Sequence, residues 1–262
     1  MHPAPKKSLG QHFLTDRNIL GAVADAAEVG PGDTVVEVGP GRGTLTTVLA
    51  ERAARVIALE LDAELVAQLR QSMPANVDVR PADARAVAPS GVLGECVPYK
   101  LVGNLPYYAA LPILRVFLES DCRPAAAAVL VQKEVASQMC ARPGSMSLVS
   151  LAVQLFGEPR IIRLVRPGAF NPPPKVTSAI VGIRVYAQPA EGIQDTNAFF
   201  RLVRAGFSAP RKQLRNALAN GLGVPARTAE ALLSAAEIDP SARAETLSLA
   251  EWASLYRAWG GT

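Results

Sequence analysis

Residues 34–43 read Thr-Val-Val-Glu-Val-Gly-Pro-Gly-Arg-Gly, and this stretch decides the fold. Its first half is rich in β-branched residues, which predicts a short buried strand over 34–38. Three glycines follow at alternate positions, where they allow positive φ and a close approach of a ligand to the backbone. Residues 44–52 then have helical character. A strand, a glycine-rich turn and a helix in this order indicate the first βα unit of an α/β domain.

Strand and helix patterns alternate through the rest of the first half, which predicts βαβ units and a parallel sheet covered on both faces. The predicted strands are 34–38, 55–60, 77–80, 99–103, 125–131, 160–165 and 178–185. The predicted helices among them are 44–52, 62–73, 111–119, 133–140 and 146–156. The last two strands have no helix between them, so we expect an antiparallel pair that closes a mixed seven-stranded sheet.

A polar stretch with Pro and Gly at 186–196 predicts a linker. Beyond it, helical patterns cover 197–207, 212–219, 226–236 and 249–259. The chain is therefore expected to form an α/β domain at 1–186 and a small all-α domain at 187–262.

The composition excludes a largely disordered protein, because 49% of the 262 residues are hydrophobic and 19% are charged. The longest charge-free apolar stretches, 101–114 and 143–157, are too short for a membrane span. No apolar run follows Lys6 and Lys7, so we expect no secretory signal. The sequence predicts a soluble, cytoplasmic protein without a membrane partner.

The three cysteines, Cys96, Cys122 and Cys140, are odd in number and widely spaced, which argues against a disulfide framework. We expect three small buried thiols in a reducing compartment. With only two histidines and no C-x-x-C, the sequence has no metal-ligand spacing, so no metal is predicted.

The glycine turn and two carboxylates predict a nucleoside cofactor. Glu60 ends the second predicted strand, where a carboxylate can accept hydrogen bonds from both hydroxyls of a ribose. Asp83 follows the third strand, where it can accept from an adenine amino group. The dinucleotide pattern G-x-G-x-x-G needs a glycine at position 44, which is Thr44. A cofactor without a pyrophosphate is therefore favoured, and a tight turn beside two surface acids is the alternative.

Residues 103–108 read Gly-Asn-Leu-Pro-Tyr-Tyr and follow the fourth predicted strand. The exocyclic amine of adenine is a poor nucleophile because its lone pair is delocalised into the ring. Two acceptors aimed at its hydrogens, the Asn104 side-chain oxygen and a backbone carbonyl of Leu105 or Pro106, would draw the nitrogen towards tetrahedral geometry. Tyr107 offers a face on which a flipped base can stack. The segment therefore predicts a site that acts on an adenine amine.

Asn104–Tyr107 resembles motif IV of the ribosomal RNA adenine N6,N6-dimethyltransferases. Residues 7–14 (KSLGQHFL) resemble the family's N-terminal G-Q-N/H-F-L segment, and residues 36–43 resemble its V-E-x-G-P-G-x-G loop. Residues 170–178 (FNPPPKVTS) resemble its F-x-P-x-P-K-V-x-S segment. Residues 205–214 (AGFSAPRKQL) resemble the F-x-x-R-x-K/R-x-L stretch that opens its helical domain.

The resemblance implies a Rossmann-like class I methyltransferase fold that uses S-adenosylmethionine. It implies that the cofactor contacts His12, Leu14, Gly39, Gly41, Glu60, Leu61, Asp83, Ala84 and Asn104. It further implies that the target adenine is held by Asn104, Leu105, Pro106, Tyr107 and Phe170, with Tyr107 and Phe170 on its two faces.

The net charge of +4 is unevenly distributed, since residues 142–227 hold 12 basic and 3 acidic side chains. This asymmetry predicts a surface that faces a polyanion, with a solvated charged face as the alternative. Together with the resemblance it predicts RNA binding by Arg201, Arg204, Arg211, Lys212 and Arg215.

The resemblance implies a monomer that dimethylates two adjacent adenosines in the loop of the 3′-terminal hairpin (helix 45) of 16S rRNA in the pre-30S particle, and so a role in small-subunit assembly. An Erm-type methyltransferase of 23S rRNA is one alternative. A non-catalytic RNA-binding assembly or transcription factor on the same fold is another. The intact glycine turn with Glu60, Asp83 and Asn104 favours catalysis.

Overall fold

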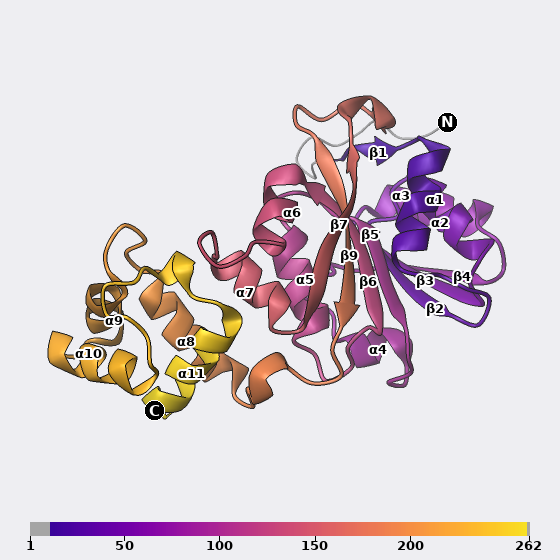
Figure 1. The fold of residues 1–262 in the computed structure, drawn as a ribbon. Helices are drawn as coiled ribbons and strands as arrows, with labels where there is room; N and C mark the ends of the chain where they lie inside the picture. Colours follow the sequence, from indigo (N-terminus) through magenta and orange to yellow (C-terminus); the bar gives the residue numbers. More distant parts are fainter. Residues whose placement is uncertain (1–10, 261–262) are drawn as a thin grey trace. The chain divides into compact units, whose positions relative to one another are not determined.

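The computed structural model describes residues 11–260, so Lys7–Gly10 of the N-terminal motif lie outside the described residues. The chain divides into two compact units, and each is described by itself (Figure 1). One unit holds the residues up to Ser137 together with Glu158–Ala187, and the other holds Gln138–Gly157 together with the residues from Gln188 on. In this division the chain enters the second unit at residue 138, returns to the first at residue 158 and leaves it again at residue 188. The sequence predicts a single boundary after residue 186, and the two domains 1–186 and 187–262 stay a prediction.

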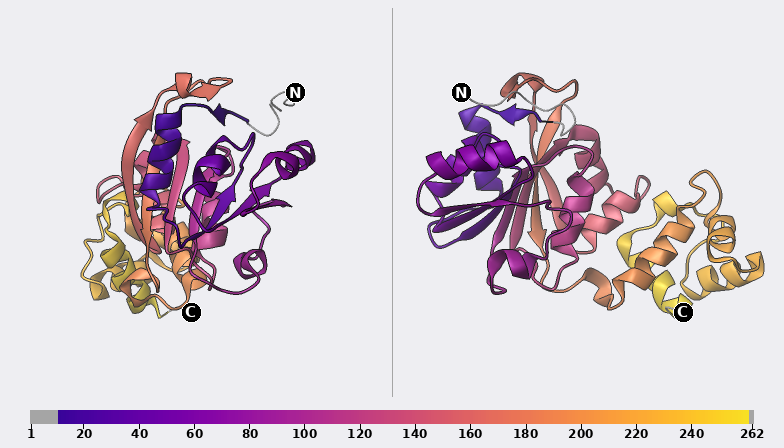
Figure 2. Two further views of the ribbon diagram at one scale, coloured as in Figure 1. Left: turned by 90° about the vertical axis from the view of Figure 1, so that its right-hand side faces the viewer. Right: turned by 180° about the vertical axis from the view of Figure 1, so that it is seen from behind.

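The first unit is built on a seven-stranded sheet with the order β4-β3-β2-β5-β6-β9-β7. Figure 2 shows this sheet from two further sides. The strands are β2 (Thr34–Val38), β3 (Arg55–Glu60), β4 (Val77–Pro81), β5 (Lys100–Asn104), β6 (Ala126–Gln132), β7 (Gly157–Val165) and β9 (Ser178–Val185). β2 pairs in parallel with β3 and β5, β3 with β4, and β5 with β6, whereas β9 runs antiparallel to β6. The predicted mixed seven-stranded sheet is therefore confirmed.

The sheet is covered on both faces, as parallel strands require. Neighbouring residues on one strand point to opposite faces, and Val35 and Val36 are both fully buried. The same holds for Leu101 and Val102 on β5. The helices of this part of the chain are α1 (Arg17–Ala26), α2 (Thr44–Ala50), α3 (Ala63–Ser72), α4 (Pro89–Leu93), α5 (Ala110–Leu118) and α6 (Lys133–Met139).

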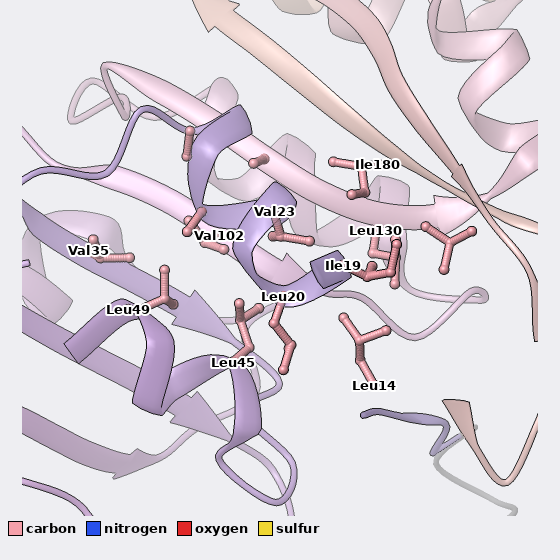
Figure 3. Packing of buried hydrophobic residues seen from close by; sticks show 14 of the residues in the cluster. Leu14, Ile19, Leu20, Val23, Val35, Leu45, Leu49, Val102, Leu130 and Ile180 are labelled. Atoms are coloured by element: carbon pink, nitrogen blue, oxygen red, sulfur yellow. The ribbon is translucent and has the colours of Figure 1, made fainter. Parts of the chain in front are cut away.

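Helix α1 is an element that the sequence analysis does not contain. It begins where the Asp16 carboxylate accepts hydrogen bonds from the backbone N–H groups of Asn18 (2.9 Å) and Ile19 (3.3 Å). Its buried face packs with α2 and the sheet in one core cluster that includes Val23, Leu49 and Leu130 (Figure 3). Full burial of such side chains contributes about 1.5–3 kcal/mol each. The helix thereby anchors the chain directly after the N-terminal motif.

A second unanticipated element is a two-stranded antiparallel sheet, β1 (Phe13–Leu14) with β8 (Phe170–Asn171). Leu14 lies opposite Phe170, and both side chains are buried in one core cluster, in which Figure 3 labels Leu14. This pairing joins the N-terminal motif to the segment that precedes β9.

The second unit is helical in its C-terminal part, as expected. Its helices are α7 (Leu148–Gln154), α8 (Thr196–Gly206), α9 (Leu214–Leu222), α10 (Ala226–Ala235) and α11 (Leu249–Trp259). α11 begins with a reciprocal cap, in which the Ser248 hydroxyl accepts from the Glu251 N–H and the Glu251 carboxylate accepts from the Ser248 N–H. Trp252, which is fully buried, stacks on Phe207 with ring centroids 5.6 Å apart. No helix within residues 11–260 is long and apolar enough to cross a membrane.

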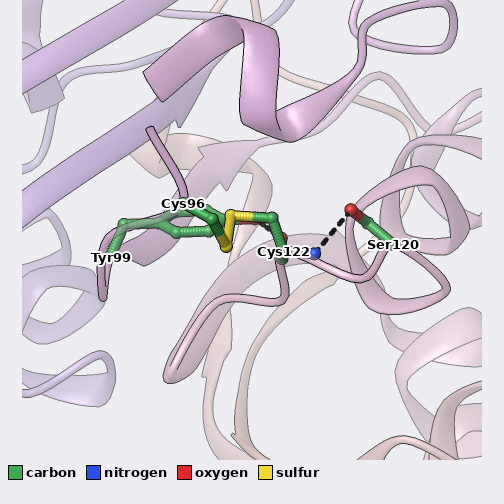
Figure 4. The surroundings of a disulfide bond; sticks show 4 residues. All are labelled: Cys96, Tyr99, Ser120 and Cys122. Atoms are coloured by element: carbon green, nitrogen blue, oxygen red, sulfur yellow. Dashed lines mark hydrogen bonds between the residues drawn. A yellow bond between two sulfur atoms is a disulfide. The ribbon is translucent and has the colours of Figure 1, made fainter. Parts of the chain in front are cut away.

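The expectation of three free thiols is wrong for two of the cysteines. Cys96 and Cys122 form a disulfide, with Cα atoms 5.5 Å apart (Figure 4). The loops that carry them come together beside the start of β5, where the Tyr99 hydroxyl donates to the Cys122 carbonyl at 3.0 Å. A separation of 26 residues gave no sign of this contact. Within the described residues, Cys140 forms no disulfide, and its side chain is half-buried.

Candidate active site

A cleft opens where β2, β3, β4 and β5 end, which is the edge at which parallel α/β sheets bind ligands. It has a volume of about 830 Å³ with its open mouth included. The lining residues are Gln11, His12, Phe13, Val38, Gly39, Gly41, Leu59, Glu60, Leu61, Ala82, Asp83, Ala84, Arg85, Asn104, Leu105, Pro106, Tyr107, Tyr108, Ala109 and Ile113. The cleft therefore brings together most of the residues that the sequence analysis selected.

The glycine turn brings bare backbone to the floor of the cleft. Gly39, Gly41 and Gly43 have φ values of 71°, 57° and 80°, a region that other residues rarely adopt. At Gly41 a Cβ atom would lie 2.8 Å from the Phe13 ring. A side chain at this position would therefore strain the backbone and collide with β1.

Glu60 is the buried carboxylate of the cleft, at 6% exposure. Its Oε2 accepts from the Gly41 N–H at 3.0 Å and its Oε1 from the Asp62 N–H at 2.9 Å. Burial raises the pKa of Glu60, and these backbone donors oppose the increase. The carboxylate is thus held in one orientation beside the glycine turn, where it can accept from the hydroxyls of a ribose.

Glu37 lies beneath the turn and does not line the cleft. The side chain is 1% exposed, and within residues 11–260 its Oε2 has no hydrogen-bond partner. Burial raises the pKa of Glu37 to about 8, and the neighbouring Thr46 hydroxyl opposes this increase. The Glu37 side chain is therefore protonated at neutral pH.

Asp83 is paired with Arg85 at the rim. The Arg85 Nη2 and Nε atoms lie 2.6 Å from Oδ2 and 2.9 Å from Oδ1 of Asp83. The Arg85 backbone N–H also donates to Asp83 Oδ1 at 3.0 Å. The Arg85 guanidinium lowers the pKa of Asp83, so this carboxyl stays ionised.

Asn104 ends β5 and has its amide held in place by the N-terminal motif. Its Nδ2 donates to the backbone carbonyl of His12 at 2.8 Å. The His12 Nδ1 in turn donates to the Pro172 carbonyl at 2.8 Å. Within the described residues, Asn104 Oδ1 accepts no hydrogen bond, so it remains available to a ligand.

Tyr107 is fixed at both its ring and its hydroxyl. Its ring stacks with His12 at a centroid distance of 6.1 Å, and its hydroxyl lies 2.7 Å from Ser178 Oγ. Burial raises the pKa of Tyr107, and the hydrogen bond with Ser178 opposes the increase. The Tyr107 side chain is therefore a neutral, oriented aromatic wall of the cleft.

Two of the residues predicted to contact the cofactor or the target adenine do not line the cleft. Leu14 and Phe170 are 3% and 4% exposed and belong to the core cluster instead. The structure thus does not bring the Phe170 ring together with Tyr107 around an open space. The stacking role of Phe170 stays a prediction.

The predicted RNA-binding residues belong to α8, α9 and the turn between them. Arg201, Arg204, Arg211 and Lys212 are exposed. The Arg201 guanidinium lies 5.1 Å from the centre of the Trp259 ring, and Arg215 pairs with Glu230 at 3.4 Å. Within residues 11–260, no group of three His, Cys, Asp or Glu side chains is arranged to hold a metal ion.

The sequence model of the ribosomal RNA adenine dimethylase family matches residues 4–259. The chain belongs to this family. Among curated relatives, the ribosomal RNA small subunit methyltransferase A of Dehalococcoides mccartyi (strain ATCC BAA-2266 / KCTC 15142 / 195) is 47% identical, over 94% of this chain and 86% of the relative. That of Moorella thermoacetica is 43% identical, over 97% of this chain and 92% of the relative. The sequence-based resemblance is thereby confirmed.

Two solved structures of RNA-modifying and related transferases share the fold of this chain. The crystal structure of the 23S rRNA methyltransferase ErmE matches with a TM-score of 0.73 and 29% identity, over 94% of this chain and 98% of that one. A dimethyladenosine transferase from Plasmodium falciparum matches with a TM-score of 0.78 and 25% identity, over 93% and 96%. The predicted class I methyltransferase fold with a C-terminal helical part is confirmed.

Several lining residues of this dimethylase-family chain were not selected from the sequence. Gln11 and Phe13 flank His12 within the N-terminal motif, so the motif itself was a signal for them. Arg85 and Tyr108 follow Ala84 and Tyr107 directly and were missed because no motif position marks them.

Proposed function

We propose that this chain is an S-adenosylmethionine-dependent rRNA adenine N6,N6-dimethyltransferase. Its substrate is the pair of adjacent adenosines in the loop of helix 45 of 16S rRNA, within the pre-30S particle. The observation that carries the proposal is the fixed amide of Asn104, whose Nδ2 is used by the His12 carbonyl and whose Oδ1 remains free. Asn104 Oδ1 is a fixed acceptor in the cleft, and it can accept a hydrogen bond from one of the two N–H groups of an adenine amine.

The residues of the cleft fit the cofactor. Buried Glu60 beside the glycine turn would hold the ribose, and ionised Asp83 would accept from the adenine amine. Leu61 and Ala84 line the same part of the cleft. S-adenosylmethionine supplies a methyl carbon that its sulfonium has already activated, so the protein has to position the amine more than to deprotonate it.

The second acceptor for the target amine is the Leu105 carbonyl. The other candidate, the Pro106 carbonyl, already accepts the Ala109 N–H at 2.9 Å. Within the described residues, the Leu105 carbonyl accepts no hydrogen bond. Asn104 Oδ1 and the Leu105 carbonyl together would orient the nitrogen lone pair towards the methyl carbon. We assign the amine proton to water, since His12 is the only His or Lys side chain among the described residues that line the cleft.

The names of the curated relatives favour the small ribosomal subunit over the large one as the substrate. The curated relatives at 43–47% identity carry small-subunit names, whereas the 23S rRNA enzyme ErmE is 29% identical. In keeping with this substrate, we assign the protein to the cytoplasm as a monomer that acts during small-subunit assembly. The proposed rRNA contacts are the exposed basic residues of α8 and of the turn before α9, together with Arg215 of α9.

The decisive experiment uses purified protein, labelled S-adenosylmethionine and either unmethylated 30S or 50S subunits. We expect N6,N6-dimethyladenosine in 16S rRNA by mass spectrometry and no label in 50S subunits. Label in 23S rRNA alone would identify an Erm-type enzyme. Tight binding to 30S subunits without any methyl transfer would identify a non-catalytic assembly factor.

A further inference from the structure

Tyr108 is an aromatic side chain that the proposed transfer reaction does not use. It lines the mouth of the cleft next to Tyr107, yet 57% of it is exposed. Tyr107 is tied to Ser178 and stacked on His12, whereas the described residues offer Tyr108 neither a hydrogen bond nor a ring contact. An aromatic ring that is open to solvent at the rim of a cleft can stack on a nucleotide base.

Arg85 lines the same cleft as Tyr108. Its Nε and Nη2 hold Asp83, so the fork is fixed in orientation. Its Nη1 makes no hydrogen bond within the described residues, and the side chain is 45% exposed. The Arg85 guanidinium also offsets the negative charge of the ionised Asp83, which alone would repel a phosphate at this rim. An oriented guanidinium with a spare donor suits a phosphate group.

The geometry points to a second nucleotide subsite at the rim, in which the Tyr108 ring stacks a base and Arg85 Nη1 binds a phosphate. Its occupant is the RNA nucleotide next to the adenosine that lies at Asn104. This inference rests on the proposed function, because a reaction on two adjacent adenosines leaves one neighbour unstacked while the other is in the transfer site. The unstacked neighbour needs an aromatic surface, and Tyr108 provides one.

The alternative occupant of this rim is the cofactor itself, whose adenine would lie near Asp83. The two readings differ in what Tyr108 contributes. If the Tyr108 ring contacts the cofactor, its removal would raise the Kd for S-adenosylmethionine. If the ring stacks on an RNA base, its removal would raise only the KM for the RNA substrate. The experiment therefore measures both.

The test compares Tyr108→Ala, Tyr108→Phe and wild type on unmethylated 30S subunits. The matched surface control is Val97→Ala, which shortens a side chain that is 38% exposed away from the cleft. We expect Tyr108→Ala to raise the KM for subunits about fivefold or more, the loss that removal of one base stack causes. The Kd for S-adenosylmethionine, measured by calorimetry, is expected to stay unchanged. We also expect rRNA in which only one of the two adenosines is modified to accumulate.

The conservative variants sharpen the test. Tyr108→Phe keeps the ring and is expected to rescue the KM, since the stack does not need the hydroxyl. Arg85→Gln is expected to lower the slope of log affinity against log salt concentration by about one, the signature of one lost phosphate contact.

The inference is overturned if Tyr108→Ala raises the Kd for S-adenosylmethionine and leaves the KM for subunits unchanged, because the ring would then belong to the cofactor site. It is equally overturned if Tyr108→Ala behaves like Val97→Ala in every assay. Either result requires an active wild-type enzyme. An inactive wild type is a different outcome, since it contradicts the proposed function.

Discussion

Asn104 Nδ2 donates a hydrogen bond to the backbone carbonyl of His12 at 2.8 Å, across 92 residues of sequence. An amide held by its nitrogen must present its oxygen on the other side. The bond therefore sets which atom of Asn104 a ligand meets, and it makes the N-terminal motif part of the transfer site.

Asn104→Ala removes this acceptor and is expected to lower kcat about 100-fold or more, the usual cost of deleting one preorganised hydrogen-bonding group. The Kd for S-adenosylmethionine should change much less, because Glu60 and Asp83 are untouched. Single-turnover methylation of 30S subunits measures the first quantity and calorimetry the second.

Asn104→Asp is the matched variant, since it keeps an oxygen acceptor but loses the donor to His12. Its carboxylate would face the His12 carbonyl, and the two oxygens would repel each other. We expect activity between that of Asn104→Ala and wild type. Wild-type turnover by Asn104→Ala is incompatible with the proposed mechanism.

Glu60→Gln tests the ribose contact. The glutamine amide offers one acceptor oxygen, so either the Gly41 N–H or the Asp62 N–H loses its partner. We expect the Kd for S-adenosylmethionine to rise at least about tenfold, as two hydrogen bonds to a charged group are lost or weakened. Glu64→Gln, an exposed carboxylate nearby on α3, is the control. Equal Kd values for the two variants would remove Glu60 from the cofactor site.

Buried Glu37 gives the protein a specific pH dependence. Its pKa is raised from 4.5 to about 8, so the folded state keeps a proton that the unfolded state releases in this interval. The free energy of unfolding therefore falls as the pH rises from about 4.5 to about 8. The unfolding equilibrium constant rises by at most about tenfold per pH unit in this range and levels off above it.

Glu37→Gln mimics the protonated side chain and removes this dependence. We expect the variant to match wild type near pH 5 and to have the higher Tm at pH 8.5. Glu51→Gln, at the exposed end of α2, controls for the loss of one carboxylate elsewhere. A constant Tm difference between Glu37→Gln and wild type across this pH range would contradict the buried, protonated side chain.

The local sequence pattern was sufficient to predict the strands of the sheet and the polar residues that follow them at the cleft. The strands with β-branched runs, such as 34–38 and 178–185, were predicted with their observed bounds, because burial on both faces selects such residues. Glu60, Asp83 and Asn104 were selected because each ends or follows a strand at one edge of the sheet, and the cleft does bring them together.

Contacts between distant segments were not accessible in the same way. β1 and β8 are two residues long, too short for any periodicity to show. Three features depend on which loops meet in space, which no local pattern shows. They are the burial of Phe170, the Cys96–Cys122 disulfide and the Asn104–His12 hydrogen bond. α1 did carry local signals, the cap at Asp16 and a buried apolar stripe, so it could have been predicted.

The basic residues of α8, α9 and the turn between them are expected to contact rRNA phosphates, and charge reversal tests this. Arg211 and Lys212 are exposed, and the described residues offer them no ion pair. Arg211→Glu with Lys212→Glu is therefore expected to weaken 30S binding at low salt and to reduce the salt slope by about two. The control is Arg243→Glu, another exposed arginine of the same unit, which lies 3.9 Å from Glu245. Binding as tight as that of the control, or a salt dependence that is flat in the wild type, would place the rRNA contact on another surface.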